Sequence, residues 1–273
     1  MELAACPWNG EVVLRIEFEK QETHALRGGK LGKLRRLAQA VDNWPRALVD
    51  HLGLSKADYI CRMRSGICFH VRGGTDDRHI IFEVLAERIY PVKLPPGSVV
   101  VDIGAQIGCF SVWAAQQGAR VLAFEPYPPN FAALERNMRL NGLTDVRLFR
   151  VAVSDKREIR EMYLPENATH SGRYSLHVGR RTDSIHVPCF SLGDVIQENR
   201  LDRIDLLKID CQGSEYEIIY GAGAEALGRT RAIVAECEVF ANHPQWSIHE
   251  LAGYLRNHGF TVETRRNILC AAR

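Results

Sequence analysis

The chain lacks the features that mark several classes of protein. No apolar run in its 273 residues approaches the ~20 residues that a membrane-spanning helix needs, and its start lacks the basic and apolar segments of a secretory signal. The eight cysteines contain no CxxC pair, which argues against a zinc site or a compact disulfide framework. A formal net charge of +2 is too small to indicate a nucleic-acid partner. We therefore expect a reduced, cytoplasmic protein without a membrane contact.

Residues 1–96 show no regular alternation of strands and helices, and we expect them to form a small α+β extension. Leucines at helical spacing predict a helix over residues 24–41, whose remaining positions include basic but no acidic residues. A hairpin is expected over residues 59–72 and a helix over residues 76–88. The basic helix is consistent with a solvated surface, with a contact to an acidic substrate or partner, or with a subunit interface, so a homodimer stays open.

Residues 97–273 alternate β-branched apolar runs with helical segments. Strands are expected at residues 98–103, 120–124, 146–151, 206–209 and 232–235, and helices at residues 107–117, 130–140, 214–220 and 247–258. This alternation predicts a doubly wound, mostly parallel α/β sheet with right-handed crossovers. Ser214 and Glu217 have the spacing of a capping box.

Residues 155–200 interrupt this rhythm. The segment is polar, contains His170, and is too long for an ordinary connection. Long insertions in α/β domains are often lids or substrate loops, so we expect this one to shape the substrate site. Together with the basic helix, it is expected to cover the ligand crevice.

The first motif is a β-branched strand that runs into a glycine-rich turn and a helix, at residues 99–108. Glycine lets the backbone approach a ligand closely, and the ligand of an open α/β sheet sits beyond the carboxyl ends of the strands. A dinucleotide fingerprint would need glycines at 102, 104 and 107, where this chain has Asp102, Gly104 and Ile107. A nicotinamide-dependent oxidoreductase is therefore the weaker alternative.

The second motif is Glu125, an acid at the end of the next strand. A carboxylate in this place can accept hydrogen bonds from both hydroxyls of a ribose cis-diol. Glu125 and the preceding glycine turn, in this order, predict a nucleoside-containing cofactor.

The third motif, LLKIDCQGSEYE at residues 206–217, brings Lys208 and Asp210 to the carboxyl end of a further strand. It resembles the LLKIDxEGxExxxL signature of the FkbM-family methyltransferases. Further similarities are the glycine turn, Phe124-Glu125-Pro126, Ala152-Val153-Ser154-Asp155, Ser191-Leu192-Gly193-Asp194 and Arg72-Gly73-Gly74-Thr75-Asp76. The resemblance covers roughly residues 70–240. One departure is Gln212, which stands where the family has glutamate and cannot act as a base.

The resemblance implies a class I methyltransferase fold, with a seven-stranded Rossmann-like sheet. It also implies S-adenosylmethionine as the cofactor, S-adenosylhomocysteine as the product, and methyl transfer to a hydroxyl of a small-molecule, sugar or natural-product acceptor. By position, the resemblance implies that the cofactor is bound by Asp102, Gly104, Ala105, Gly108, Glu125, Pro126, Val153 and Ser154.

Methyl transfer from a sulfonium requires donor and acceptor in near-attack geometry, and a hydroxyl acceptor benefits from a base. Asp210 is best placed for that role. His170 is a further candidate because histidine titrates near neutral pH. Lys208 is a third catalytic candidate, although a structural charge at the strand end would explain it equally.

Two alternatives concern the site and the acceptor. Asp210, Glu236 and Glu238 follow neighbouring strands and could hold Mg²⁺ through oxygen ligands, although we expect no metal. An RNA methyltransferase is the other alternative, but the basic stretch at 27–36 has no interleaved aromatic residues for stacking on bases. We therefore expect a small-molecule or glycan acceptor.

Overall fold

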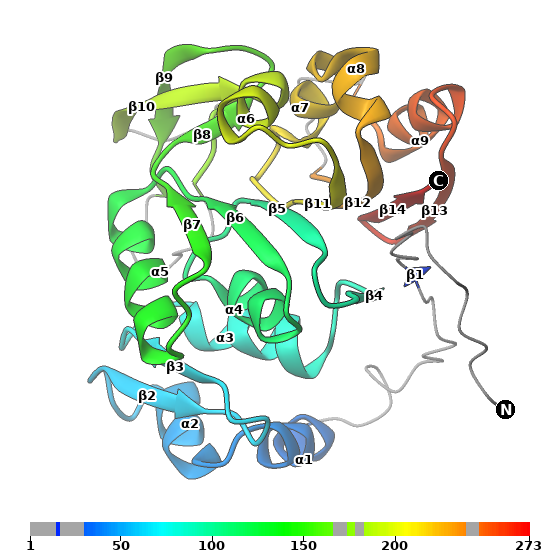
Figure 1. The fold of residues 1–273 in the computed structure, drawn as a ribbon. Helices are drawn as coiled ribbons and strands as arrows, with labels where there is room; N and C mark the ends of the chain where they lie inside the picture. Colours follow the sequence, from blue (N-terminus) through cyan, green and yellow to red (C-terminus); the bar gives the residue numbers. More distant parts are fainter. Residues whose placement is uncertain (1–14, 17–29, 166–173, 178–182, 239–245) are drawn as a thin grey trace, which may run out of the picture.

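The computed structural model describes residues 15–16, 30–165, 174–177, 183–238 and 246–273 (Figure 1). Its centre is a seven-stranded sheet, with the order β13-β14-β12-β11-β5-β6-β7 within these residues. The strands are β5 (Val99–Ile103), β6 (Arg120–Phe124), β7 (Val146–Phe149), β11 (Ile204–Ile209), β12 (Thr230–Glu236), β13 (Thr261–Arg265) and β14 (Ile268–Ala272). Only β14 is antiparallel to its neighbours, β12 and β13. The predicted doubly wound, mostly parallel seven-stranded sheet is confirmed.

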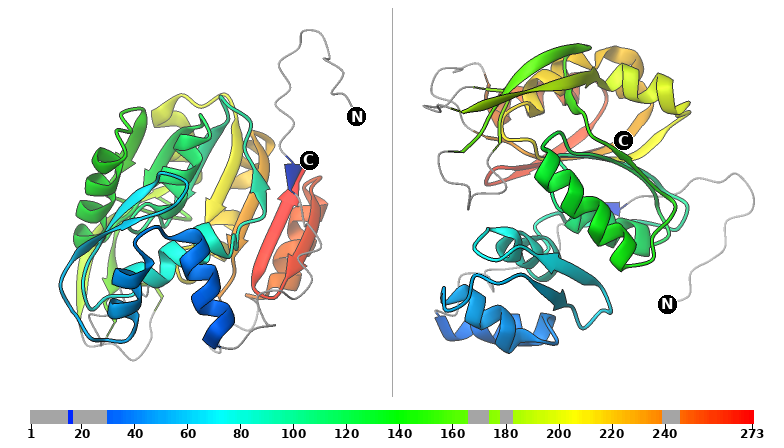
Figure 2. Two further views of the ribbon diagram at one scale, coloured as in Figure 1. Left: turned by 90° about the horizontal axis from the view of Figure 1, so that it is seen from below. Right: turned by 90° about the vertical axis from the view of Figure 1, so that its left-hand side faces the viewer.

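Helices cover both faces of this sheet (Figure 2). Successive side chains of a strand point to opposite faces, so Val100 packs with one helix layer and Val101 with the other. The first layer contains α4 (Cys109–Gln116) and α5 (Pro128–Leu140), and the second contains α6 (Leu192–Asn199), α7 (Glu215–Gly221), α8 (Gly223–Gly228) and α9 (Ile248–Asn257). None of the helices in the described residues is long and apolar enough to cross a membrane.

The N-terminal extension lies against the layer of α4 and α5. It consists of β1 (Arg15–Ile16), α1 (Lys30–Ala40), α2 (Trp44–His51), β2 (Tyr59–Arg62), β3 (Cys68–Val71), α3 (Asp77–Ile81), the π-helical turn η1 (Phe82–Ala86) and β4 (Val92–Lys93). The predicted hairpin is therefore β2–β3, and the helix predicted over 76–88 is α3 with η1. The helix predicted over 24–41 is described from Lys30 onward. Buried residues of the extension share one hydrophobic core with α4, α5 and the sheet, and the boundary at residue 97 stays a prediction.

Two asparagines, one in α5 and one at its C-cap, attach the extension to this layer. Asn137, fully buried, accepts from the backbone N–H of His70 at 2.8 Å and donates to the carbonyl of Ile107 at 2.8 Å. One turn later, Asn141 accepts from the N–H of Cys68 at 2.9 Å and donates to its carbonyl at 2.7 Å. The two side-chain amides thus take the place of a neighbouring strand along β3, which satisfies backbone groups that would otherwise be unpaired.

The segment at 155–200 contributes two strands to a second, small sheet near β7, and the third strand comes directly before it (Figure 1). The strands of this sheet are β8 (Ala152–Ser154), β9 (Glu158–Tyr163) and β10 (Ser184–Ser191), in the order β8-β10-β9. β10 runs parallel to β8 and antiparallel to β9, and it leads into α6, whose N-terminus has a capping box of Ser191 and Asp194.

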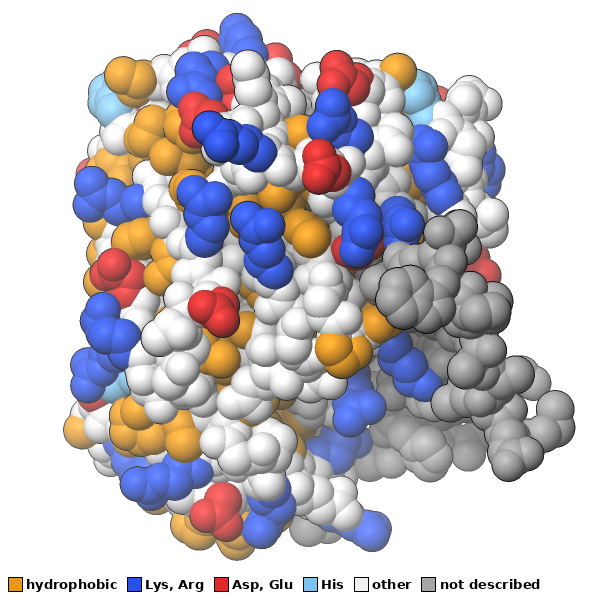
Figure 3. All heavy atoms as spheres, viewed as in Figure 1, with side chains coloured by type: hydrophobic (Ala, Val, Ile, Leu, Met, Phe, Trp, Pro, Cys, Tyr) orange, Lys and Arg blue, Asp and Glu red, His pale blue; other side chains and the backbone are white. Residues whose placement is uncertain are grey.

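On the face shown in Figure 3, lysine and arginine side chains are scattered among acidic and apolar ones and form no single stripe.

Replacing Asn137 with alanine should destabilise the protein through the loss of its two backbone partners. Each of the two buried groups left without a partner costs about 1–3 kcal/mol, so we expect the free energy of unfolding to fall by about 2–6 kcal/mol in chemical denaturation. Arg139→Ala, at an exposed position of the same helix, is the matched control and should change it by less than about 0.5 kcal/mol. Equal effects of the two substitutions would contradict this account.

Candidate functional site

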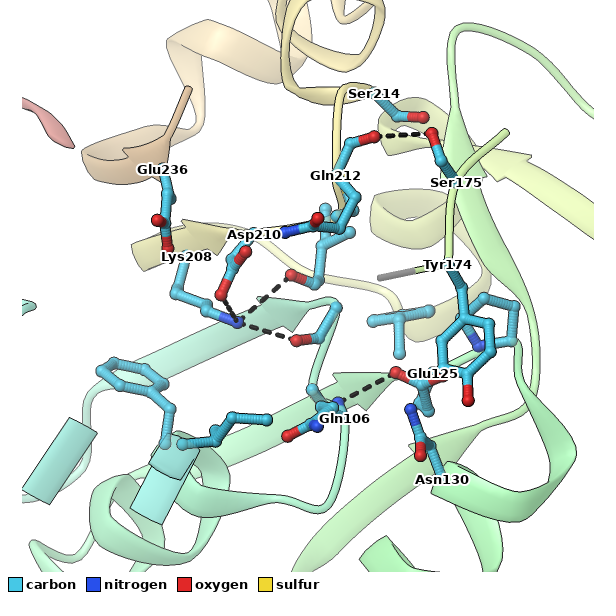
Figure 4. A pocket seen from close by; sticks show the side chains of 18 of the residues that line it. Gln106, Glu125, Asn130, Tyr174, Ser175, Lys208, Asp210, Gln212, Ser214 and Glu236 are labelled. Atoms are coloured by element: carbon cyan, nitrogen blue, oxygen red, sulfur yellow. Dashed lines mark hydrogen bonds and ion pairs between the residues drawn. The ribbon is translucent and has the colours of Figure 1, made fainter. Parts of the chain in front are cut away.

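A cavity of about 780 Å³ opens beyond the carboxyl ends of β5, β6, β11 and β12 (Figure 4). Its walls come from the loops that follow these strands, from the extension between residues 76 and 90, from residues 174–177, and from parts of α4, α5, β8 and β9. This is the edge at which open α/β sheets bind their ligands.

A buried ion pair lies at the base of the cavity. Lys208 on β11 and Asp102 on β5 are register partners, and the Lys208 Nζ lies 3.0 Å from the Asp102 carboxylate. Burial by itself lowers the pKa of Lys208, but the charges of Asp102 and Asp210 raise it above its ordinary value. The second oxygen of Asp102 accepts from the Ser111 hydroxyl at 2.6 Å. Asp102 is thus enclosed and does not line the cavity, whereas Lys208 does.

The glycine turn after β5 is held against the strand beside it. Lys208 donates to the carbonyl of Gly104 at 2.8 Å, and the Gly104 N–H donates to the carbonyl of Phe124 at 3.0 Å. Gly104 has φ +76°, and a Cβ there would lie 1.8 Å from the backbone oxygen of Asp210. Only glycine can take this position without moving the loop after β11.

Glu125 is the acid at one end of the cavity (Figure 4). It follows β6, its carboxylate accepts from the backbone N–H of Gln106 and of Tyr127, both at 2.9 Å, and only 5% of the residue is exposed. Burial raises its pKa to about 7, although the two N–H groups counteract part of this rise. Glu125 is therefore a fixed acceptor that titrates near neutral pH.

Aromatic and apolar side chains surround Glu125. The rings of Tyr174 and Tyr127 stack with centroids 3.9 Å apart, and Val153 of β8 contributes an apolar wall. Asn130 of α5 also lines this end, where its side-chain oxygen accepts from Arg72 at 2.8 Å. Arg72 is itself held by a two-pronged contact with the buried Asp77, with both distances 2.7 Å. This end of the cavity is therefore bordered by an apolar surface on one side and by polar groups on the other.

The opposite end of the cavity is acidic. The Tyr90 hydroxyl donates to Asp210 at 2.7 Å, and Asn267 donates to Glu236 at 2.8 Å. Burial, reinforced by the charge of Asp210, raises the pKa of Glu236 to about 7. In Figure 4, Glu236 and Asp210 lie on the side of the cavity away from Glu125.

The loop after β11 is shaped by Glu215. Its buried carboxylate accepts from the N–H groups of Cys211 at 2.9 Å and Gly213 at 2.8 Å, and burial raises its pKa to about 7. These bonds hold Gln212 at φ +58°, with its carbonyl accepting from the Ser175 hydroxyl at 2.6 Å. Residues 174–177 are thereby fastened to the loop at the edge of the cavity.

The capping box predicted for Ser214 and Glu217 is wrong. Ser214 is the N-cap of α7 but makes no side-chain cap hydrogen bond; its hydroxyl lies 3.3 Å from the His177 ring. Glu217 instead pairs with Arg160 of β9 at 2.9 Å and with His177 at 3.3 Å. Both residues are used to attach the insertion to α7 rather than to begin the helix.

The structure brings most of the predicted site residues together. The predicted residues that line the cavity are Gly104, Ala105, Glu125, Pro126, Val153, Lys208 and Asp210. Ser154, like Asp102, is buried outside the lining, and Gly108 is the N-cap of α4, where it faces Leu134. His170 lies outside the described residues.

Several lining residues were not expected from the sequence. Tyr90 and Tyr174 come from segments without a recognisable motif, and Gln106 was hidden within the glycine turn. His177, which also lines the cavity, belongs to the insertion that was expected to shape the site. Glu236 was considered only as a ligand of a metal. In the part of the chain that the structure describes, no group of three or more His, Cys, Asp or Glu side chains is arranged to hold a metal ion.

Comparisons with known proteins agree with the motifs. The model of the methyltransferase FkbM domain family matches residues 102–262, more than half of the chain. The chain is similar to 31-O-demethyl-FK506 methyltransferase FkbM of Streptomyces tacrolimicus, with 31% identity over 238 residues that cover 74% of this chain and 88% of that protein. It is also similar to the 2-O-methyltransferase NoeI of Sinorhizobium fredii, with 32% identity over 158 residues, 52% of this chain and 63% of that protein.

A third relative is much longer than this chain. The AMB antimetabolite synthetase AmbE of Pseudomonas aeruginosa is 31% identical over 235 residues, which cover 71% of this chain. The matching region is 11% of AmbE, so the similarity concerns one part of that protein.

Replacing Gly104 with alanine should destabilise the protein for two reasons: alanine disfavours the positive φ at this position, and its Cβ would collide with the backbone oxygen of Asp210. Gly142→Ala is the matched control because Gly142 also has a positive φ, of +65°, but a Cβ there would contact nothing within 4 Å. We expect Gly142→Ala to lower the free energy of unfolding by about 1–2 kcal/mol and Gly104→Ala to lower it by about 3 kcal/mol or more, measured by chemical denaturation. If both variants lost the same amount, the contact with Asp210 would not matter.

Proposed function

The chain belongs to the FkbM family of methyltransferases, and from this premise we propose that it methylates a hydroxyl oxygen of a small-molecule, sugar or natural-product acceptor, with S-adenosylmethionine as the donor. Two relatives support oxygen as the methylated atom, since one is named for 31-O-demethyl-FK506 and the other is a 2-O-methyltransferase. Family membership sets aside the nicotinamide-dependent oxidoreductase that the glycine turn also allowed. The observation that carries the proposal is the fixed carboxylate of Glu125 beside the glycine turn.

The residues at this end of the cavity suit the nucleoside part of the donor. The carboxylate of Glu125 is held by two backbone N–H groups and would accept hydrogen bonds from the ribose hydroxyls. Val153 and Tyr174 would enclose the adenine, because both belong to the apolar wall next to Glu125. Gly104 and Ala105 would lie along the methionine part. Among the other predicted cofactor residues, Pro126 would border the ribose, whereas Asp102, Gly108 and Ser154 would act from behind the lining.

The acceptor would bind at the other end, beside Asp210. S-adenosylmethionine supplies the methyl group: its C–S bond breaks with the electron pair left on sulfur, while the acceptor oxygen forms the new C–O bond. Asp210 would accept a hydrogen bond from the acceptor hydroxyl and so orient its oxygen. Lys208 is a positioning residue in this proposal, since it holds the carbonyl of Gly104 and lies 3.9 Å from Asp210. Residues 174–177 would exclude water from the donor.

The proposed function is tested by binding and by turnover. We expect S-adenosylmethionine and S-adenosylhomocysteine to bind in calorimetry while NAD does not. Labelled methyl groups from S-adenosylmethionine should then appear in one or more members of a panel of methyl glycosides, cyclic diols and macrolide alcohols. Transfer only to amines would overturn the choice of oxygen, transfer only to RNA would overturn the small-molecule acceptor, and failure to bind either sulfur nucleoside would overturn the function itself.

The pKa of Glu125 predicts how donor binding depends on pH. Below pH 7 the carboxylate becomes protonated and loses its ability to accept from both ribose hydroxyls, so affinity should fall with pH. For a pKa of about 7, the ionised fraction falls roughly tenfold from pH 8 to pH 6. Glu125→Gln, which has nearly the same shape but no titratable group, is the matched control.

The measurement is the dissociation constant of S-adenosylhomocysteine for both proteins at each pH. The titration of the ligand and of other acids affects both proteins equally and cancels in the ratio of the two dissociation constants. The higher affinity of the wild-type chain, relative to Glu125→Gln, should therefore decrease about tenfold from pH 8 to pH 6. A ratio that does not change with pH would mean that Glu125 does not bind the ribose as a carboxylate.

A further inference from the structure

Three residues occupy matching places at the edge of the sheet. Ile209 of β11 is the register partner of Ile103 on one side and of Ala235 on the other. The next residues along the three strands are Asp210, Gly104 and Glu236. Because register partners of parallel strands share a face, the side chains of Asp210 and Glu236 leave the sheet on the same side, on strands about 4.8 Å apart. A single hydroxyl group can therefore contact both carboxylates.

The two carboxylates have different surroundings. One oxygen of Asp210 is engaged by the Tyr90 hydroxyl at 2.7 Å and lies 3.9 Å from the cation of Lys208. Glu236 accepts from the neutral amide of Asn267 through one oxygen, and within the described residues no lysine or arginine lies at ion-pair distance from it. Each carboxylate thus has one oxygen that accepts a hydrogen bond from a described residue and one that is left for the acceptor. The difference between them is that Asp210 lies beside the cation of Lys208, which favours its ionised form, whereas Glu236 has no such partner among the described residues.

The charges that most affect Glu236 are negative, while the cation of Lys208 lies 3.9 Å from Asp210. Asp210 faces it from β11, Glu238 from the loop after β12, and Glu83 from η1 in the extension. Tyr90, which lies between β4 and η1, is neutral at these pH values because burial raises its pKa well above its ordinary value. Together with burial, these acids raise the pKa of Glu236 to about 7, which is the range in which a carboxylate accepts and releases a proton readily.

We propose that Glu236 is the general base of this enzyme and that Asp210 orients the acceptor hydroxyl. The proposal rests on the proposed function, because it needs a hydroxyl acceptor at the acidic end of the cavity. As the acceptor oxygen forms its C–O bond and the C–S bond of the donor breaks, the hydroxyl proton passes to the free oxygen of Glu236. Glu236 then releases this proton to water before the next turnover. The family signature marks Asp210 on β11, but nothing in it marks Glu236.

Glu236→Gln should abolish proton transfer while leaving donor binding intact. With saturating S-adenosylmethionine and the methyl glycoside or diol of the panel that the wild-type chain methylates fastest, we expect kcat to fall about 100- to 1,000-fold. The affinity for S-adenosylhomocysteine should change less than about twofold, which shows that the variant is folded. Glu225→Gln, on the exposed face of α8, is the matched control and should retain full activity.

The pH profile separates a base from a structural residue. For the wild-type chain, kcat should rise about tenfold per pH unit below pH 7 and level off above it, since only ionised Glu236 accepts the proton. Saturation with the donor keeps Glu125 out of this profile. Glu236→Gln should lose the inflection, and Glu236→Asp should keep it with a lower plateau. Asp210→Asn should raise KM and keep an inflection, which should move to lower pH because a negative charge that raises the pKa of Glu236 is removed.

Three results would overturn the inference. The first is wild-type kcat and an unchanged pH profile in Glu236→Gln. The second is loss of the inflection in Asp210→Asn, which would make Asp210 the base. The third is a wild-type chain that binds S-adenosylhomocysteine but methylates no member of the panel, since the proposed function would then fail together with the base. If Glu236→Gln did not bind S-adenosylhomocysteine, the pH profile of Glu236→Asp would decide between the two roles. A base predicts a lower plateau of kcat in this variant, whereas a purely structural carboxylate predicts the same profile as the wild-type chain.

Discussion

The buried ion pair between Lys208 and Asp102 is the interaction on which the site depends. Transferring two charges from water into a protein interior is costly, and here the cost is offset because both groups are also hydrogen-bonded. Ser111 donates to Asp102, and Lys208 donates to the carbonyl of Gly104. The pair therefore joins β5 to β11 at the edge where the cavity opens. Removing either partner would leave a buried charge without its counterpart and release the glycine turn.

The glycine turn and the loop after β11 are fitted to each other around this pair. Gly104 leaves no room for a Cβ against Asp210, so the two loops lie in backbone contact. Glu215 fixes the second loop through two N–H groups, and Gln212 extends the network to Ser175. The family glutamate at position 212 is not required for this link, because the carbonyl of Gln212 makes it and every residue has a carbonyl. Rigid backbone contacts of this kind are what a transfer reaction needs to hold two reactants at a fixed distance.

The sequence predicted the sheet, and it identified the glycine turn and Glu125, which line one cavity, because these signals are local. Alternating apolar runs identify buried strands, and the glycine turn and Glu125 each follow such a strand directly. The failures arose where a residue's partner is distant in the chain. Ser214 and Glu217 have the correct spacing for a capping box, but His177 and Arg160 from the insertion engage them instead. In the same way, no local pattern reveals that Tyr90 reaches Asp210, 120 positions further along the chain.

The division of the cavity between two parts of the chain has a consequence for how such an enzyme can diversify. The donor end is built mainly from loops between sheet strands, where the backbone conformation leaves little freedom to change. The acceptor end takes part of its wall from the extension, where His79, Glu83 and Tyr90 lie on short helical and coil segments. If this end binds the acceptor as proposed, substitutions in those segments would alter which alcohol is chosen and leave the donor end unchanged. The choice of acceptor and the transfer reaction would then vary independently within one polypeptide.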